Sequence, residues 1–138
     1  MNIDPLLGLF LSLPIGVASG LYSSLIVSKI ARFSALRSEC LRVIRGISFI
    51  GESQDIVVLG KENVAQLPLI AGEMRHLGHK KAGAIASELY SSILGCNIAA
   101  EYGKISVEDY GRNFALWQEK SREMSASLWQ LYWPFSRL

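Results

Sequence analysis

The sequence has little of the chemistry that enzymes and metal proteins need. Its 138 residues include only two cysteines, Cys40 and Cys96, and neither stands in a CxxC or similar metal-ligand spacing. It has no Gly-rich phosphate loop, no HExxH pair, no nucleophile elbow and no paired-carboxylate constellation. We therefore expect a protein that is not an enzyme and uses no cofactor or metal, with both cysteines reduced and buried as small apolar side chains.

Charge is also scarce. Charged residues make up 19% of the chain and the formal net charge is +2, whereas 50% of the residues are hydrophobic and the mean hydropathy is +0.27. So small an excess of positive charge is too little for the whole chain to bind nucleic acid by electrostatics alone. The composition favours a membrane-attached helical protein over a soluble enzyme.

The longest apolar segment runs from Asp4 to Lys29 and has no charge between these two residues. As a helix it would extend about 36 Å, enough to cross a hydrocarbon core of about 30 Å with some tilt. Pro14 is compatible with such a span, because neighbouring helices can satisfy the backbone group that proline frees. The segment therefore predicts an N-terminal transmembrane helix.

Small residues recur at every fourth position of this segment. They are Gly8, Ser12, Gly16, Gly20, Ser24 and Ser28. A helical wheel places most of them on one half of the helix and the bulky apolar side chains on the other. Because glycine permits close backbone approach, the spacing predicts that the helix packs against copies of itself into a homo-oligomer. The packing positions are Gly8, Gly16, Gly20 and Ser24.

Serine hydroxyls on the same half could face a water-filled pore, because they solvate a lumen without the cost of burying a charge. The candidate pore-facing residues are Ser12, Ser19 and Ser23. The alternative is that GxxxG, which is common in membrane spans, marks only an anchor here.

The flanking charges predict an orientation. Lys29, Arg32 and Arg37 follow the span, and more arginines lie beyond them, so the positive-inside bias places the C-terminal domain in the cytoplasm of a bacterial inner membrane. A cleaved signal peptide is the rival interpretation, but the segment has no basic n-region and stays apolar past the candidate cleavage site. We expect residues 1–31 to form the membrane helix with an outward-facing N-terminus, and residues 32–138 the cytoplasmic domain.

The cytoplasmic part has helical periodicity and few strand signals, which predicts an all-α fold with a small helical bundle. The expected helices cover residues 32–50, continuing the membrane helix, then 68–77, 80–102 and 107–131. Residues 51–54 predict a turn, 61–66 a loop, and 55–60 are ambiguous between a short helix and a strand. Ser106 and Asp109 resemble a capping box at the start of the last helix.

Several residues are candidates for contact with lipid or a partner. They are Lys29, Arg32, Arg37, Trp129, Trp133 and Arg137. The basic residues would meet anionic headgroups or acidic neighbours, and the aromatic tail would return to the membrane interface. The alternative is that the tail completes the bundle or a subunit interface.

A metal site has only a weak basis. Glu73, His76 and His79 would lie on one side of a helix, but Gly78 interrupts the spacing and Lys80 follows at once, which favours a solvated basic turn. Arg75 and His79 resemble the arginine–histidine pair of helical ribonucleases, yet they stand closer together than in that family.

The layout of a small-residue membrane helix, with Gly16, Gly20, Ser23 and Ser24, before a basic helical domain resembles small single-pass membrane effectors of bacterial antiviral systems. The membrane accessory proteins of type VI CRISPR systems are one such family. The resemblance implies an oligomeric pore that permeabilises the membrane, with itself and lipids as partners. Two alternatives remain: an anchored scaffold that recruits a cytoplasmic protein, and a membrane-held nucleic-acid-binding module. The latter would need Arg37, Arg42, Arg45, Lys80 and Lys81 to converge on one surface.

Overall fold

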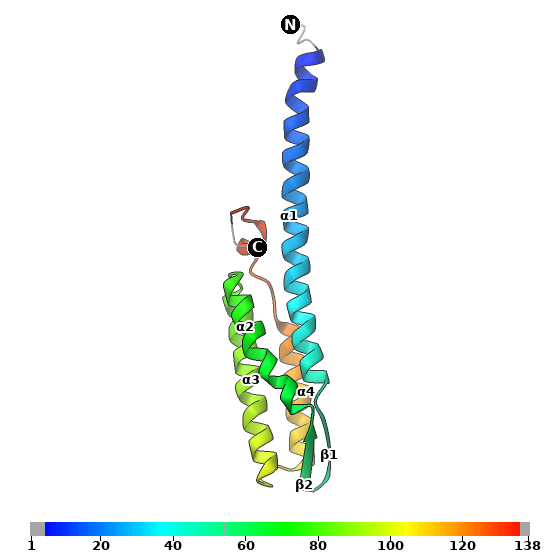
Figure 1. The fold of residues 1–138 in the computed structure, drawn as a ribbon, viewed down its shortest axis with the longest axis vertical. Coiled ribbons are helices and arrows are strands. Elements are labelled where there is room, and N and C mark those ends of the chain that lie inside the picture. The colour runs from blue at the N-terminus through cyan, green and yellow to red at the C-terminus, as the bar shows by residue number, and fades with distance from the viewer. Residues whose placement is uncertain (1–4, 54, 136–138) are drawn as a thin grey trace.

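The computed structural model describes residues 5–53 and 55–135, with side chains from residue 14 onward. Its elements, in chain order, are α1 (Pro5–Arg45), β1 (Ser48–Glu52), β2 (Asp55–Leu59), the 3₁₀ helix η1 (Lys61–Gln66), α2 (Leu67–His76), α3 (Lys80–Glu101), α4 (Val107–Glu123) and α5 (Leu128–Tyr132). The C-terminal half of α1 packs against α2 and α4, which in turn pack against α3, whereas the N-terminal half of α1 extends beyond them (Figure 1). The fold is therefore mostly helical, with one long apolar N-terminal helix.

Helix α1 runs for 41 residues without a break, and Pro14 lies inside it. The apolar segment and the first basic segment are thus one continuous helix, as the sequence allowed. The expectation that this helix reaches residue 50 is wrong, because it ends at Arg45. The amide of Gly46 still donates to the Arg42 carbonyl, but the chain then turns and becomes extended at Ser48.

Residues 48–59 form an antiparallel hairpin, so the all-α expectation holds only for the rest of the described chain. Ile50 pairs with Val57 and Phe49 pairs with Val58. The inward-facing Phe49 ring packs on Tyr110 of α4, with the ring centroids 4.8 Å apart. Alternating β-branched and aromatic side chains fit a half-buried strand. The contact of Phe49 with Tyr110 of α4 favours the strand over a helix in this segment.

The helices at 68–77 and 80–102 are confirmed as α2 and α3, each within one residue. These two helices cross closely at Gly83, where a Cβ atom would lie 2.8 Å from the Ala71 carbonyl oxygen. The predicted loop at 61–66 is instead η1, which leads directly into α2. The largest fully buried side chains of the core are Tyr110, Ile44, Leu67, Met74, Leu89, Ile93 and Met124.

Helix α4 begins as predicted, because the Ser106 hydroxyl accepts a hydrogen bond from the Asp109 amide at 3.1 Å. The single long helix expected over residues 107–131 is wrong, since α4 ends at Glu123 and α5 starts only at Leu128. Met124 has extended backbone angles (φ −56°, ψ 122°) and a fully buried side chain. The three-four spacing of apolar residues continues through this break, so burial of Met124 and docking of the next segment override the local helical pattern.

One buried polar pair joins α3 to α4. The Tyr110 hydroxyl donates to the Asn97 side-chain oxygen at 2.7 Å, and both residues are buried. Burial raises the pKa of Tyr110 to about 12. The phenol therefore remains a neutral donor throughout the physiological range.

Candidate functional site

From Pro14 to Ser24, α1 packs against almost nothing in its own chain. Every described residue from Pro14 to Ser24 is exposed, including Ile15 at 68% and Leu21 at 69%. Within Pro14–Arg45, the most apolar window is long and apolar enough to cross a membrane, and only 6% of that window is buried. A soluble core helix of this composition would be mostly buried, so the exposed apolar surface requires an apolar environment or a partner.

The small residues of α1 leave an open surface. A Cβ atom at Gly16 or Gly20 would have no described neighbour within 4 Å outside its own helix turn. Ser23 and Ser24 are exposed, and the Ser19 hydroxyl donates to the Gly16 carbonyl oxygen at 3.0 Å. The backbone of Gly8 and Ser12 is helical, but their side chains lie outside the described part. The predicted packing face therefore has room for a second helix along its described length.

The C-terminal segment docks on α1 where the apolar stretch ends. In Figure 1, α5 lies beside the middle of α1. The Tyr22 hydroxyl donates to the Tyr132 carbonyl oxygen at 2.5 Å. The Lys29 ammonium donates to the carbonyl oxygens of Trp133 at 2.7 Å and Gln130 at 3.4 Å. Because the last carbonyls of a helix lack intrahelical partners, the positive charge of Lys29 satisfies the C-terminal end of α5.

Lys29, a predicted lipid or partner contact, is engaged within the chain. Its side chain is only 6% exposed and lies beneath the C-terminal segment. Arg32 forms an exposed ion pair with Glu73 of α2 at 3.0 Å, and Arg37 donates to the Met124 carbonyl oxygen at 3.4 Å. Of the four predicted basic contacts, the three that the structure describes are thus engaged within the chain.

We expect Lys29→Met to release α5 from α1. Hydrogen bonds from a charged donor contribute about 1.5–3 kcal/mol, so the opening of this segment should become about 10- to 100-fold more frequent. Hydrogen exchange of the Leu131 and Trp133 amides, which are bonded within α5, measures the effect. Lys104→Met, at an exposed lysine away from α5, is the control. Unchanged protection in Lys29→Met would show that the ammonium does not hold the segment.

The docked segment exposes its aromatic side chains. Trp129 is 66% exposed and Trp133 45%, and the two rings stack with centroids 5.0 Å apart. Phe135 is 86% exposed and contacts Trp133 edge-on. Arg137 lies outside the described residues. The aromatics therefore do not complete the core of this chain; they form a surface beside the apolar stretch of α1.

His79 connects three segments of the fold, a role that the sequence did not predict. It is 4% exposed, its ring packs edge-on against Phe33 of α1, and its Nδ1 accepts a hydrogen bond from the Ser127 amide at 3.1 Å. It thereby joins α1, the α2–α3 turn and the segment before α5. This role depends on Phe33 of α1 lying beside His79 in the folded chain. The spacing of residues in the sequence does not show that contact.

The other residues around His79 form no metal site. Among the described residues, no group of three or more histidine, cysteine or acidic side chains could hold a metal ion. Arg75 donates to the Ser87 hydroxyl at 2.6 Å, whereas His79 faces Ser127. The structure thus assigns Arg75 and His79 to different contacts.

We expect acid to release the same C-terminal segment. Burial lowers the pKa of His79 below its ordinary value of 6.5, and Nδ1 can accept a hydrogen bond only while it is unprotonated. The unfolded chain binds the proton more readily, so this contribution to stability is present above pH 6.5 and is lost as the pH falls through the folded-state pKa. Hydrogen exchange of residues 125–133 at pH 7 and pH 5 measures the loss. His79→Gln, whose amide does not titrate, should abolish the part of the pH dependence that is due to this residue.

The basic residues of the nucleic-acid alternative do not converge. Arg42 pairs with Glu39 near the end of α1, whereas Lys80 lies beside His79, level with Phe33. Arg45 is twelve residues beyond Phe33, about 18 Å further along the helix axis. The structure therefore does not bring Arg45 and Lys80 together on one surface.

Comparison of the chain with protein-family models, with curated proteins and with solved structures finds no match. The function is therefore inferred from the geometry of the chain itself.

Proposed function

We propose that this protein is a single-pass membrane protein that self-associates through the Gly16 and Gly20 face of α1 and permeabilises the membrane. The observation that supports this best is the exposed surface of α1 from Pro14 to Ser24, which has apolar side chains on one face and open glycines on the other. From Pro5 to Ser28 the helix extends about 36 Å, and about 30 Å suffices to cross the bilayer. The bacterial inner membrane, with the helical domain in the cytoplasm, is the proposed location.

The position of the aromatic surface, formed by Trp129, Trp133 and Phe135, along α1 supports the same placement. Tyr22 and Lys29 mark where α5 meets α1, at the end of the apolar stretch. Tryptophan and tyrosine rings concentrate at the headgroup level of membranes. With α1 in the bilayer, Trp129, Trp133 and Phe135 lie at its cytoplasmic interface.

The proposed pore is lined by serine hydroxyls. Ser19 uses its proton within its own helix, which leaves its oxygen able to accept hydrogen bonds from water. Ser19 therefore needs no polar partner from a neighbouring helix, and the proposed lining residues are Ser12, Ser19 and Ser23. They can face either a wet lumen or an adjacent helix as the assembly opens and closes.

Dye release from liposomes tests this function. Full-length protein should release an encapsulated dye, and a variant with polyleucine in place of residues 5–24 should insert but release none. Extraction with alkaline carbonate verifies insertion of both proteins. Equal release by both would contradict a lumen built from the small-residue face, and no release by the inserted wild-type protein would contradict permeabilisation.

A second candidate function, an anchored scaffold, is favoured by the outer face of the hairpin. Ile50 is 69% exposed and its cross-strand partner Val57 62%, and Leu59 lies beside them at 50%. This apolar face lies at the end of the domain away from the aromatic surface (Figure 1). It is a surface on which a cytoplasmic protein could dock while α1 serves only as the anchor.

A further inference from the structure

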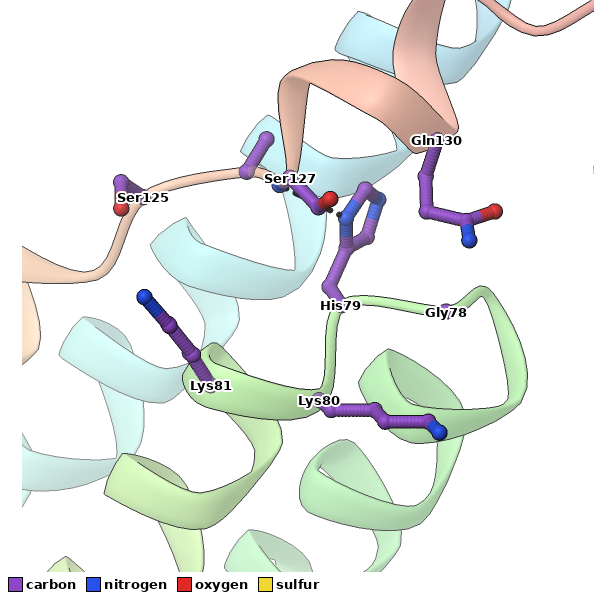
Figure 2. Close-up of a pocket in the computed structure, with 8 residues that line it drawn as sticks. Gly78, His79, Lys80, Lys81, Ser125, Ser127 and Gln130 are labelled. Carbon is purple, nitrogen blue, oxygen red and sulfur yellow. Dashed lines mark hydrogen bonds between the residues drawn. The ribbon is translucent and has the colours of Figure 1, made fainter.

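A cleft separates the α2–α3 turn from the segment that leads into α5. It has a volume of about 430 Å³ and is lined by Gly78, His79, Lys80, Lys81, Ser125, Ala126, Ser127 and Gln130. Figure 2 shows His79 between the two walls, with Lys81 extending toward Ser125 and Lys80 extending the opposite way, below Gly78. Two cations and two hydroxyls thus line the cleft, and none of the described residues that line it carries a carboxylate.

Backbone donors also point to an anion. Helix α3 begins at Lys80, and no side chain caps its start. The Lys80 amide donates to the Gly78 carbonyl oxygen at 3.0 Å. The N–H groups that follow it in the first turn have no intrahelical partners, and they concentrate positive partial charge. Lys81 and the hydroxyl of Ser125 lie beside this helix end, so charged, hydroxyl and backbone donors face the same space.

His79 adds a donor from a buried position. Its Nδ1 is occupied as an acceptor from Ser127, so the neutral ring has its proton on Nε2. That nitrogen lies on the Gln130 side of the ring, at the cleft (Figure 2). A side chain that is 4% exposed therefore has its remaining donor at the cleft wall.

The position of the cleft relative to the proposed membrane indicates which kind of anion it binds. It lies directly beside α5, whose aromatic rings the proposed function places at the cytoplasmic membrane interface. A phosphate group of the inner leaflet would lie at this depth. With α1 inserted as proposed, the cleft therefore lies next to the lipid headgroups and not in the bulk cytoplasm.

We infer that this cleft binds a phosphate group, and that the phosphate belongs to an anionic membrane lipid such as phosphatidylglycerol. The inference rests on the proposed membrane insertion of α1. Lys81, Ser125 and the start of α3 contact the phosphate, and Lys80, which lines the cleft on the Gly78 side, adds positive charge. Phosphatidylcholine binds less well, because its choline cation opposes the two lysines.

Titration in lipid nanodiscs tests the inference with the full chain. The backbone amide shifts of Lys81, Ala82, Ser125 and Ser127 are followed as phosphatidylglycerol replaces phosphatidylcholine. A saturating shift is expected in the wild type. The double variant Lys80→Gln/Lys81→Gln should need about 30-fold more phosphatidylglycerol, which corresponds to the loss of two cations near an anionic surface. The control Lys104→Gln/Lys120→Gln removes the same charge away from the cleft and should titrate like the wild type.

A second arm separates the sources of phosphate. Inorganic phosphate and glycerol phosphate are added to the chain in pure phosphatidylcholine nanodiscs. If these soluble phosphates shift the backbone amide signals of the cleft residues and phosphatidylglycerol does not, the assignment to a lipid is overturned. If neither gives them, or if both double variants respond alike, the phosphate site itself is overturned. A chain that fails to enter nanodiscs contradicts the proposed function, and the soluble phosphates then test the site independently.

Discussion

Gly16→Leu/Gly20→Leu is expected to disperse the proposed oligomer while leaving the helical domain of residues 32–138 folded. Each leucine would place a large side chain where two helix backbones are proposed to approach, and overpacking of this kind costs about 1–3 kcal/mol per site. Two sites per interface imply association that is weaker by about 30-fold or more. The mass of the detergent-solubilised full chain, measured across a protein dilution series, gives the shift.

The domain should tolerate these changes because a Cβ at either glycine meets no described neighbour outside its own helix turn. Ala18→Leu is the matched control, since it adds bulk to the same helix at about 200° from Gly16 on a helical wheel. It should assemble like the wild type. Equal dispersal by Ala18→Leu would indicate a general disturbance of the span, and no dispersal by the glycine variant would exclude this face as the interface.

Trp117→Ala should produce a large loss of stability in the helical domain of residues 32–138. Trp117 is 2% exposed, its Nε1 donates to the Ser92 hydroxyl at 2.9 Å, and its ring lies 5.7 Å from that of Tyr110. It therefore links α4 to α3 through both packing and a hydrogen bond. Truncating a buried tryptophan costs about 3–5 kcal/mol, a large part of the total stability of a small domain.

Chemical unfolding of the full chain in mild detergent, followed by far-ultraviolet circular dichroism, measures this loss. Trp129→Ala removes the same side chain from an exposed position and should change the free energy of unfolding by no more than about 0.5 kcal/mol. Similar losses in both variants would mean that the aromatic surface of α5 is part of the core. That outcome would also weaken its proposed place at the membrane interface.

Patterns local in the sequence predicted much of the helical fold. The uncharged stretch before Lys29 predicted a long apolar helix, and α1 is that helix. Apolar spacing predicted α2 and α3 within one residue, and Ser106 predicted the start of α4. These features depend on side chains within one or two helical turns of each other, so the chain order alone contains them.

The hairpin and the interruption at Met124 were not predictable in the same way. Phe49 and Ile50 continue the apolar pattern of α1, and Leu128 and Leu131 continue that of α4, so local spacing favoured helix in both places. Phe49 is held by its contact with Tyr110, about sixty positions later in the chain. The segment after Met124 is held by Arg37 and His79.

The features of the candidate site also divide into those that the local sequence specifies and those that depend on tertiary contacts. The sequence by itself determined the apolar helix, its small residues and the aromatic content of the C-terminal segment, because composition and spacing within one helix specify them. Only the tertiary structure decided that Lys29 satisfies the carbonyls of that segment and that Lys81 and Ser125 line one cleft. The physical reason is that such polar contacts form between residues about 45 to 100 positions apart. Their distances are set by the packing of α1 against α2, α4 and α5 and of α2 against α3.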